Sequence, residues 1–341
     1  MKTVLVAGAG GFIGGHLVKH LLNKCYNVIA VDIKPISKWY QDHDSAITMG
    51  CQKEQFCSSY AGWDLKAKQG CQQIFEYYPQ IDEVYNLACN MGGMGFIENN
   101  RFLCMESVLI NTHLMQVSLN HHVKKYLFTG SACQYPIFLQ NDPSKIINLK
   151  ESDMYPSQPE WGYGNEKLFS EQLCLIAAED HPIQTRVVRM YNIFGPNGTW
   201  QGGREKAPAA VCRKILECKY LQKPEIEIWG DGNQVRNFTY IDDCIYGLDL
   251  IMNGQYTQPI NLGREESVTI NQLVDIAQEI AGINPIRTYK LDAPKGVGTR
   301  NTDNTLIKEI FNWEPSISIK DGMYKTYEWI EQEFKKVHGI H

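Results

Sequence analysis

A glycine-rich turn close to the N-terminus constrains the fold of this chain more than any other sequence feature. Gly8, Gly11 and Gly14 follow an apolar run that begins at Val4, and the pattern then continues directly into a helical stretch. Glycines at this spacing permit a tight turn and allow backbone N–H groups to approach a pyrophosphate at the helix N-terminus. A packing turn without a ligand is the alternative. The strand before the turn and the helix after it favour a binding site.

The second predicted strand ends in Asp32, and this residue limits which cofactor the predicted phosphate site can bind. A carboxylate at that strand end can accept both ribose hydroxyls of a dinucleotide, and it would repel a 2′-phosphate. NAD is therefore favoured over NADP. Asp64 and Leu65 are predicted to reach the adenine, with a plain turn aspartate as the alternative. The other predicted cofactor contacts are Phe12, Ile13, Leu87, Ala88, Tyr163 and Lys167.

Short β-rich runs alternate with helical stretches through the first half of the chain. The runs are VLVAGA from Val4, NVIAVD to Asp32, EVYNLA to Ala88, KYLFTG to Gly130 and TRVVRMYNIFG from about Thr185. This alternation predicts an α/β fold, a Rossmann-type doubly wound parallel sheet with a smaller α/β substrate-binding domain. We expect residues 1–196 plus about 234–260 to form the NAD-binding domain. The substrate-binding domain then comprises about 197–233 plus 261–341.

Helical periodicity is clearest in two other places. One long helical stretch lies between the third and fourth strands, with its apolar residues on one face. Those apolar residues are Leu103, Ile110, Leu114 and Val117. Thr269 and Gln272 form a capping box at the start of another helix, which places a helix N-terminus there.

Composition limits the possible partners and the compartment. The chain has 341 residues and a formal net charge of -5, so a general nucleic-acid-binding face is not expected. No run is apolar for long enough to span a bilayer, and we expect no membrane partner. The 11 cysteines are scattered without a CxxC pair, which favours reduced thiols and a cytoplasmic protein. The adjacent His121 and His122 lack further ligands nearby, so no metal site is predicted.

A second motif carries the chemistry. Tyr163 and Lys167 are four residues apart and therefore share one face of a helix, and Ser131 ends the strand before them. Removal of hydride from a carbinol needs a base for the hydroxyl proton, and a tyrosine of ordinary pKa is a poor base near neutrality. The ammonium of Lys167 and a positive nicotinamide would favour the phenolate. An exposed helix with no catalytic role is the alternative for an isolated pair of this kind.

These motifs together resemble the extended short-chain dehydrogenases, through GAGGFIG, YxxxK and RMYNIFGP. Five further segments resemble the GDP-mannose 3,5-epimerases in particular, and the similarity extends over nearly the whole chain. The segments are NMGGMGF (Asn90 to Phe96), GSACQYP (Gly130 to Pro136), GTWQGGREKAPAA (Gly198 to Ala210), WGDGNQVRNFTYIDD (Trp229 to Asp243) and TRNTDN (Thr299 to Asn304).

The resemblance implies an isomerase that oxidises C4 of a nucleotide sugar with tightly bound NAD, epimerises C5 and C3, and then reduces C4 again. A GDP-hexose is the implied substrate and a homodimer the implied assembly. By resemblance, Cys133 removes a proton from one face of the ring and Lys206 returns one to the other. Lys206 precedes Pro208, a candidate first helical residue, and the positive helix end would lower the pKa of the lysine. A buried structural thiol and a solvated lysine are the alternatives.

A group of polar residues and glycines completes the predicted substrate site. Gly92 and Gly93 would let the backbone approach the sugar, or else serve helix packing. Basic side chains are candidates for the diphosphate or the base. The predicted substrate contacts are Gly92, Gly93, Met94, Ser131, Cys133, Asn192, Glu205, Lys206, Lys214, Gln234, Arg236 and Arg300, with Arg204 as a further candidate.

The chain also departs from the family pattern. Tyr191 and Phe194 stand where the family has His and Tyr, and the segment before Tyr163 reads Glu-Trp-Gly. A 4,6-dehydratase is a rival enzyme, but it would carry an Asp-Glu pair where this chain has Ala132 and Cys133. Another nucleotide-sugar epimerase and a non-catalytic NAD-binding scaffold are further alternatives. The dimer helices implied by the resemblance are Glu98 to His121 and Trp161 to Ala178.

Overall fold

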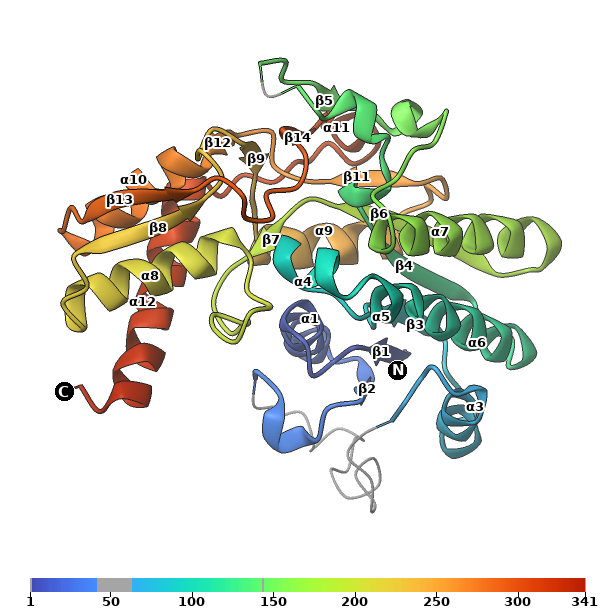
Figure 1. Cartoon of the computed structure of the whole chain (residues 1–341). Coiled ribbons are helices and arrows are strands. Elements are labelled where there is room, and N and C mark those ends of the chain that lie inside the picture. Colours follow the sequence, from blue (N-terminus) through green and yellow to red (C-terminus); the bar gives the residue numbers. More distant parts are fainter. Residues whose placement is uncertain (1, 42–62, 143, 341) are drawn as a thin grey trace.

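The computed structural model describes residues 2–41, 63–142 and 144–340, and its centre is a six-stranded parallel sheet (Figure 1). The strands lie in the order β11-β6-β4-β3-β1-β2. Because the chain passes from β1 to one edge and then returns to build the other side, the sheet is doubly wound, and the predicted fold class is confirmed. The strands are β1 Thr3–Ala7, β2 Asn27–Val31, β3 Glu83–Asn86, β4 Lys125–Ser131, β6 Gln184–Met190 and β11 Ile260–Leu262.

Helices cover both faces of this sheet, which explains why its strands are continuous apolar runs. Val4 and Val6 point to the face that α1 and α9 cover, while Leu5 and Ala7 point to the face of α3, α6 and α7. Each strand therefore contributes to two separate cores. The covering helices are α1 Phe12–Asn23, α3 Lys68–Tyr77, α6 Ser107–Asn120, α7 Tyr163–Asp180 and α9 Ile241–Asn253.

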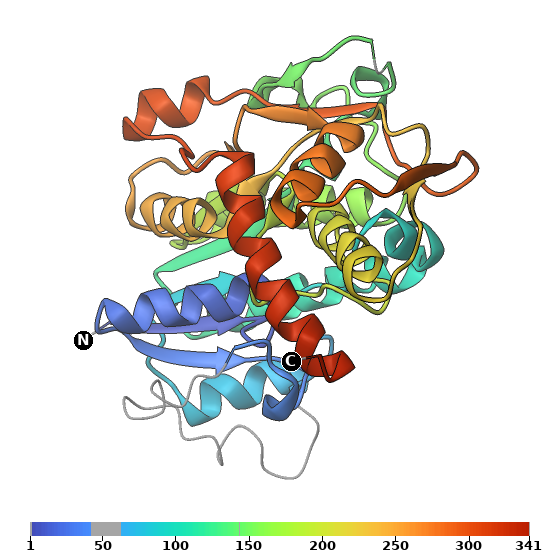
Figure 2. The ribbon, with the colours of Figure 1, turned by 90° about the vertical axis from the view of Figure 1, so that its left-hand side faces the viewer.

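The rest of the structure is a smaller α/β layer beside the sheet. Figure 2 shows the long helix α12 running alongside α8 and α10, against which it packs. Strands β8 and β13 pair in parallel, and a second small sheet has the order β12-β9-β14-β5. The elements of this layer are β5 Asn148–Leu149, α8 Ala207–Tyr220, β8 Glu225–Trp229, β9 Val235–Asn237, β12 Ser267–Thr269, α10 Ile270–Ala281, β13 Ile286–Lys290, β14 Thr299–Thr302, α11 Thr305–Phe311 and α12 Ile319–His338.

The division into two domains stays a prediction. Two strands pair in a sheet that their position along the chain would not suggest. The strand β11 belongs to the large sheet, although it lies far along the chain. The strand β5 comes early in the chain but pairs with β14 in the small sheet. Among the described residues, no helix combines the length and the apolar character needed to cross a membrane.

Two predicted elements are divided in the structure. The strand expected from about Thr185 ends at Met190, and the chain resumes as β7 Ile193–Phe194, which pairs with β10 Thr239–Tyr240. The break occurs because Asn192 adopts a φ of 43°, which turns the chain away from the sheet. The long helical stretch is also broken, into α4 Met94–Asn99, α5 Arg101–Met105 and α6.

The capping box predicted at the start of α10 is confirmed. The hydroxyl of Thr269 accepts a hydrogen bond from the Gln272 amide at 3.0 Å, and the Gln272 side chain accepts one from the Thr269 amide at 2.8 Å. Two of the helix's otherwise unpaired N-terminal donors are thereby satisfied.

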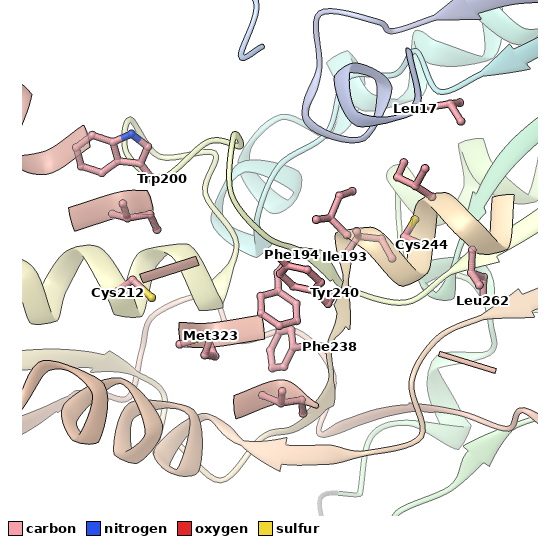
Figure 3. Close-up of a cluster of buried hydrophobic side chains, with 14 of the residues drawn as sticks. Leu17, Ile193, Phe194, Trp200, Cys212, Phe238, Tyr240, Cys244, Leu262 and Met323 are labelled. Carbon is pink, nitrogen blue, oxygen red and sulfur yellow. The ribbon is translucent and has the colours of Figure 1, made fainter. Parts of the chain in front are cut away.

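An aromatic cluster joins the two layers (Figure 3). The ring of Phe194 makes edge contacts with Phe238 and Tyr240, with centroids 6.1 Å and 5.7 Å apart. Figure 3 shows these rings between Met323 of α12 on one side and Cys244 of α9 on the other. Phe194, which stands where the family pattern has Tyr, is therefore a core residue.

We predict that Ile330→Ala lowers the free energy of unfolding by about 2–5 kcal/mol, because it opens a cavity where α12 packs on the core. Ile330 is fully buried, whereas Val337 on the same helix is 57% exposed. Val337→Ala is the matched control and should change stability by less than about 0.5 kcal/mol. Urea denaturation of both variants measures the difference. Equal effects would show that α12 is not anchored through Ile330.

Candidate active site

The carboxyl end of β1 forms the glycine turn that the sequence predicts. Gly8 has a φ of 86°, and a Cβ at Gly14 would lie 2.0 Å from the Gly8 carbonyl oxygen. Side chains at these positions are therefore excluded by backbone conformation and by close packing of the helix on the strand. Gly11 precedes α1 and offers no side-chain cap, so N–H groups of the first turn are available to an anion. This turn fits the pyrophosphate of a dinucleotide.

Asp32 directly follows β2, beside that turn. Its carboxylate accepts a hydrogen bond from the Lys34 amide at 2.9 Å, and burial raises its pKa against the opposing effect of such N–H donors. The amide of Trp63 donates to the Asp32 carbonyl at 3.0 Å, which brings the predicted adenine residues Asp64 and Leu65 to the same edge. The position of Asp32 suits recognition of a ribose.

The remaining predicted cofactor residues border the same turn. The Leu87 amide donates to the Ala7 carbonyl at 3.0 Å, and a Cβ at Gly8 would meet the Ala88 amide at 2.9 Å. Phe12 packs beneath the loop at Gly198, and Ile13 packs on the core of the sheet. All of these residues lie where the strand order reverses, which is where ligands bind in such sheets.

The turn after β4 positions Ser131 and Cys133. The Ser131 hydroxyl accepts a hydrogen bond from the Cys133 amide at 3.2 Å, and the Gln134 side chain accepts one from the Ser131 amide at 3.0 Å. Gln134 in turn donates to the buried carboxylate of Glu171, which forms an ion pair with Arg189 at 2.6 Å. A buried polar network thus fixes the turn from behind.

Tyr163 and Lys167 lie in the first two turns of α7, and both side chains are buried, at 5% and 2% exposure. The exposed-helix alternative does not describe them. The Lys167 ammonium lies 5.6 Å from the centre of the Tyr163 ring and 3.6 Å from the Glu166 carboxylate. Burial alone would lower the pKa of Lys167, but Cys89 and Glu166 outweigh it and raise that pKa. The ammonium therefore stays charged.

The surroundings of Tyr163 favour the neutral phenol, whereas the sequence predicted that they would favour the phenolate. Burial raises the pKa of Tyr163 well above its ordinary value, with the nearby Cys89 and Cys133 adding to the rise and a hydrogen bond with Ser131 opposing it. The expected preference for the phenolate is therefore not provided by Lys167 alone. Additional positive charge is needed before the phenol ionises.

Cys133 is buried beside the turn, at 7% exposure, and its Sγ accepts a hydrogen bond from Arg300 at 3.1 Å. Burial raises the pKa of Cys133 to about 11, although the Arg300 charge opposes the rise. Cys133 and Tyr163 belong to one buried cluster, which places the thiol next to the predicted hydride-transfer site.

Lys206 reaches the same place from the other layer. It is the residue that caps α8, whose first residue is Ala207, so Pro208 is the second helical residue and not the first. The pKa of Lys206 is lowered, as predicted, but burial is the largest cause, and interactions with Cys133 and Cys89 oppose it. The predicted acid and base are thus brought together from separate elements.

Gly92 and Gly93 are used in close packing within the chain. The Gly93 amide donates to the Arg204 carbonyl at 3.0 Å, and a Cβ at Gly93 would lie 2.5 Å from the Glu205 carbonyl. Gly92 faces the Phe96 ring, and Met94 lies against Gly296. Gly93 thereby holds the segment before Lys206 close to α4.

The other predicted substrate residues divide into two groups. Arg300 donates to the Cys133 sulfur at 3.1 Å, and Arg236 is its partner on the neighbouring strand, where its guanidinium donates to backbone carbonyls that include Gly298 at 3.1 Å. Gln234 is buried, and its side-chain amide has no hydrogen-bond partner among the described residues. Both observations fit a polar ligand-binding pocket.

The second group faces elsewhere in this structure. Lys214 donates to the Glu227 carbonyl at 2.6 Å, at the edge of β8. Glu205 forms an ion pair with Arg213 at 3.1 Å, and Asn192 donates to the Asn237 carbonyl at 2.9 Å. The exposed Arg204 stacks over the Phe96 ring at 4.0 Å. These side chains are not part of the cluster around Cys133.

Glu160 is a site residue that was not among the predicted ones, and its carboxylate forms an ion pair with Arg300 at 2.5 Å. Its position three residues before Tyr163, in the segment that departs from the family pattern, was the available signal. The buried Glu166 beside Lys167 and Gln140, which accepts from Arg300 at 2.9 Å, were also missed. Neither belongs to a recognisable motif.

A comparison with protein families matches residues 4–263 to the NAD dependent epimerase/dehydratase family. The chain belongs to the NAD-dependent epimerase/dehydratase family. GDP-mannose 3,5-epimerase 1 of Oryza sativa subsp. indica is 37% identical over 334 residues, covering 98% of this chain and 82% of that protein. GDP-mannose 3,5-epimerase of Arabidopsis thaliana is 36% identical over 334 residues, covering 98% and 83%.

Solved structures of this epimerase/dehydratase fold are also similar. UDP-glucose 4-epimerase from Thermotoga maritima, solved with UDP-glucose, has a TM-score of 0.83 and 23% identity and covers 97% of this chain and 99% of its own. The UDP-glucose 4-epimerase of Thermus thermophilus, solved with NAD, has a TM-score of 0.76 and 19% identity, with coverages of 96% and 98%. At these identities the likeness supports the fold.

We predict that Asp32→Ser weakens the discrimination of this epimerase/dehydratase family member against NADP. The substitution removes a negative charge that would repel a 2′-phosphate and an acceptor for the ribose of NAD. The ratio of the dissociation constants for NADP and NAD should fall by on the order of tenfold, or about 1.4 kcal/mol. Calorimetric titration with both dinucleotides measures the ratio. Asp180→Ser, at an exposed aspartate that ends α7, should leave it unchanged.

Proposed function

We propose that this protein converts GDP-mannose to GDP-L-galactose by inverting C3 and C5 of the sugar through a transient C4 ketone. The observation that carries the proposal is the meeting of Cys133 and Lys206 beside Ser131, Tyr163 and Lys167. Similarity to GDP-mannose 3,5-epimerases over 98% of the chain supports this choice of substrate.

The redox half of the reaction belongs to α7 and the turn after β4. NAD held by the glycine turn and Asp32 would supply a reversible hydride acceptor for C4. Tyr163 takes the C4 hydroxyl proton, while Ser131 orients that hydroxyl. The charged Lys167 lies close to the Tyr163 ring and favours the ionised phenol, whose pKa burial otherwise raises.

The epimerisation half uses the C4 ketone, which acidifies the hydrogens on C3 and C5. Two groups on opposite ring faces are then required, one to remove a proton and one to return it. Burial raises the pKa of Cys133 to about 11 and lowers that of Lys206 below its ordinary value, which makes the lysine the better proton donor of the two. This order suits Cys133 as the base and Lys206 as the acid.

Another nucleotide-sugar epimerase, a 4,6-dehydratase or a non-catalytic NAD-binding scaffold is the alternative. A dehydratase needs an acid to protonate the leaving hydroxyl, and the buried methyl of Ala132 offers no proton. A simple 4-epimerase has no use for two opposed proton-transferring groups. A scaffold has no use for the buried Tyr163 and Lys167. These features favour the 3,5-epimerase.

We further propose that the protein is a cytoplasmic homodimer that joins through α6 and α7. Leu109 of α6 and Phe169 and Ile176 of α7 are 41%, 49% and 54% exposed, and the two on α7 are seven residues apart on one face. Phe102 of α5 is 80% exposed at one end of this surface. Every cysteine that the structure describes is a free thiol, which supports a reducing compartment.

The function is tested by incubating GDP-mannose with the NAD-loaded protein in deuterated water. We predict deuterium uptake at C3 and C5 without accumulation of free reduced cofactor, because the hydride is returned. Tyr163→Phe should reduce uptake by about 10²- to 10⁴-fold, because no ketone forms. Mass spectrometry and NMR of the recovered sugar locate the label. Stoichiometric release of reduced cofactor would point instead to a simple dehydrogenase.

Cys133→Ala provides a control that separates the two halves. Oxidation at C4 should survive, because hydride transfer does not involve the thiol, while epimerised product should fall by a similar factor. Cys133→Ser should behave alike, since an alcohol is a far weaker acid than a thiol. A Cys133→Ala protein with normal epimerisation would assign Cys133 a structural role.

The proposed dimer is tested with Phe169→Glu, which places a charge in the apolar surface of α7. We predict that the dissociation constant of the dimer rises by at least about tenfold, because a charge is buried without a partner. Sedimentation velocity over a range of concentrations measures it. Ile310→Glu, at a 43% exposed position on α11, is the control and should leave the assembly intact. A wild-type protein that sediments as a monomer would contradict the proposal.

A further inference from the structure

Arg300 divides its guanidinium among three side chains from different parts of the chain. Its Nε donates to Gln140 at 2.9 Å, one terminal nitrogen to the Cys133 sulfur at 3.1 Å, and the other to Glu160 at 2.5 Å. The arginine is only 4% exposed. A buried guanidinium with this many partners has one fixed orientation, and that orientation aims a positive charge at the thiol.

Glu160 is attached to the same place by its main chain. Its amide donates to the Cys133 carbonyl at 3.0 Å, and its side chain is 11% exposed. One carboxylate oxygen binds Arg300, and the other is buried. Arg300, a hydrogen bond with the Cys133 side chain and the charge of Arg236 together lower the pKa of this carboxyl against the effect of burial, so Glu160 stays charged.

The charges around Cys133 are otherwise positive. Arg300 comes from β14, Arg236 from β9 and Lys206 from the start of α8, and each interacts electrostatically with the thiol. From the remaining neighbouring elements, Tyr163 and Cys89 couple to this cluster, Lys167 and Glu166 couple to Cys89, and Tyr191 couples to Arg300. The negative charge of Glu160 therefore opposes the effect of the positive charges, which favour a thiolate.

We propose that Glu160 is a positioning residue for Cys133: it holds Arg300 against the sulfur and offsets its charge, so that Cys133 rests as a thiol. The role of Cys133 as the proton-transferring group rests on the proposed function. The arrangement also protects the sulfur, because a thiol is much less reactive than a thiolate toward oxidants and alkylating agents. The direction of the titrations agrees, since burial and Glu160 raise the pKa of Cys133 while Arg300 lowers it.

The experiment is a thiolate titration followed by ultraviolet absorbance, taken as the difference between each protein and its counterpart carrying Cys133→Ala. Glu160→Gln keeps the size of the side chain but removes its charge. We expect the midpoint for Cys133 to fall by about one pH unit or more. Glu160→Asp keeps the charge, and its Cys133 midpoint should stay close to that of the wild type. Glu179→Gln, at an exposed position on α7, is the matched control and should not move the midpoint.

An unchanged or higher midpoint in Glu160→Gln overturns the proposal. If the unpaired Arg300 prevents that variant from folding, the double variant Glu160→Gln with Arg300→Gln removes both charges and leaves no unpaired ion. The double variant is compared with Arg300→Gln alone: with Arg300 already removed, Glu160→Gln should still lower the Cys133 midpoint, because the carboxylate acts on the thiol directly. A double variant that titrates at or above Arg300→Gln also overturns the proposal. Because no sugar is used, failure here is independent of failure of the epimerase proposal.

Discussion

The buried ion pair between Arg189 and Glu171 determines how the two halves of the site meet. Arg189 lies on β6, Glu171 on α7, and the arginine also donates to Tyr135 in the segment after β4. Burying both charges is unfavourable unless they stay paired, so the helix cannot rotate or slide against the sheet without a large cost. Because α7 also carries Tyr163 and Lys167, the ion pair sets the position of these two side chains relative to Ser131.

Burial then dominates the chemistry of every group that this framework places in the site. It raises the pKa of Tyr163 and of Cys133, and it lowers that of Lys206. In each case the neutral form is favoured before any neighbouring charge is considered. The pKa values of Lys167 and Arg300 are raised instead, and each of these cations has a carboxylate beside it. A paired carboxylate thus determines which cations of the site resist the effect of burial.

The large sheet could be predicted from the sequence because its strands are buried on both faces, so each appears as a short apolar run between turns. The glycine turn was equally clear, since the steric demand at Gly14 allows no side chain. The break at Asn192 was not, because a local backbone turn leaves the apolar pattern of TRVVRMYNIFG intact. The separation of α4, α5 and α6 was hidden for the same reason.

The candidate site was predictable only where a motif carried it. Tyr163 and Lys167 follow from helical spacing, and Cys133 and Lys206 from the family resemblance. Glu160 could not be assigned, because its role depends on Arg300, which lies 140 residues away in sequence. The cause of the lowered pKa of Lys206 was also hidden, since burial is a property of the folded chain and not of the local sequence. The roles of site residues could not be predicted where they depend on contacts between segments far apart in the sequence.

The placement of Lys206 at the start of α8 has a wider consequence. Cys133 belongs to the turn after β4, on the large sheet, whereas Lys206 stands on a helix that packs against α10 and α12. The side chains proposed for hydride transfer and one of the two proposed for proton transfer are therefore held by different layers. On the proposed mechanism, substitutions in the smaller layer change proton transfer while the sheet and its glycine turn stay the same. A fold assembled in this way can acquire a new sugar specificity without rebuilding its cofactor site.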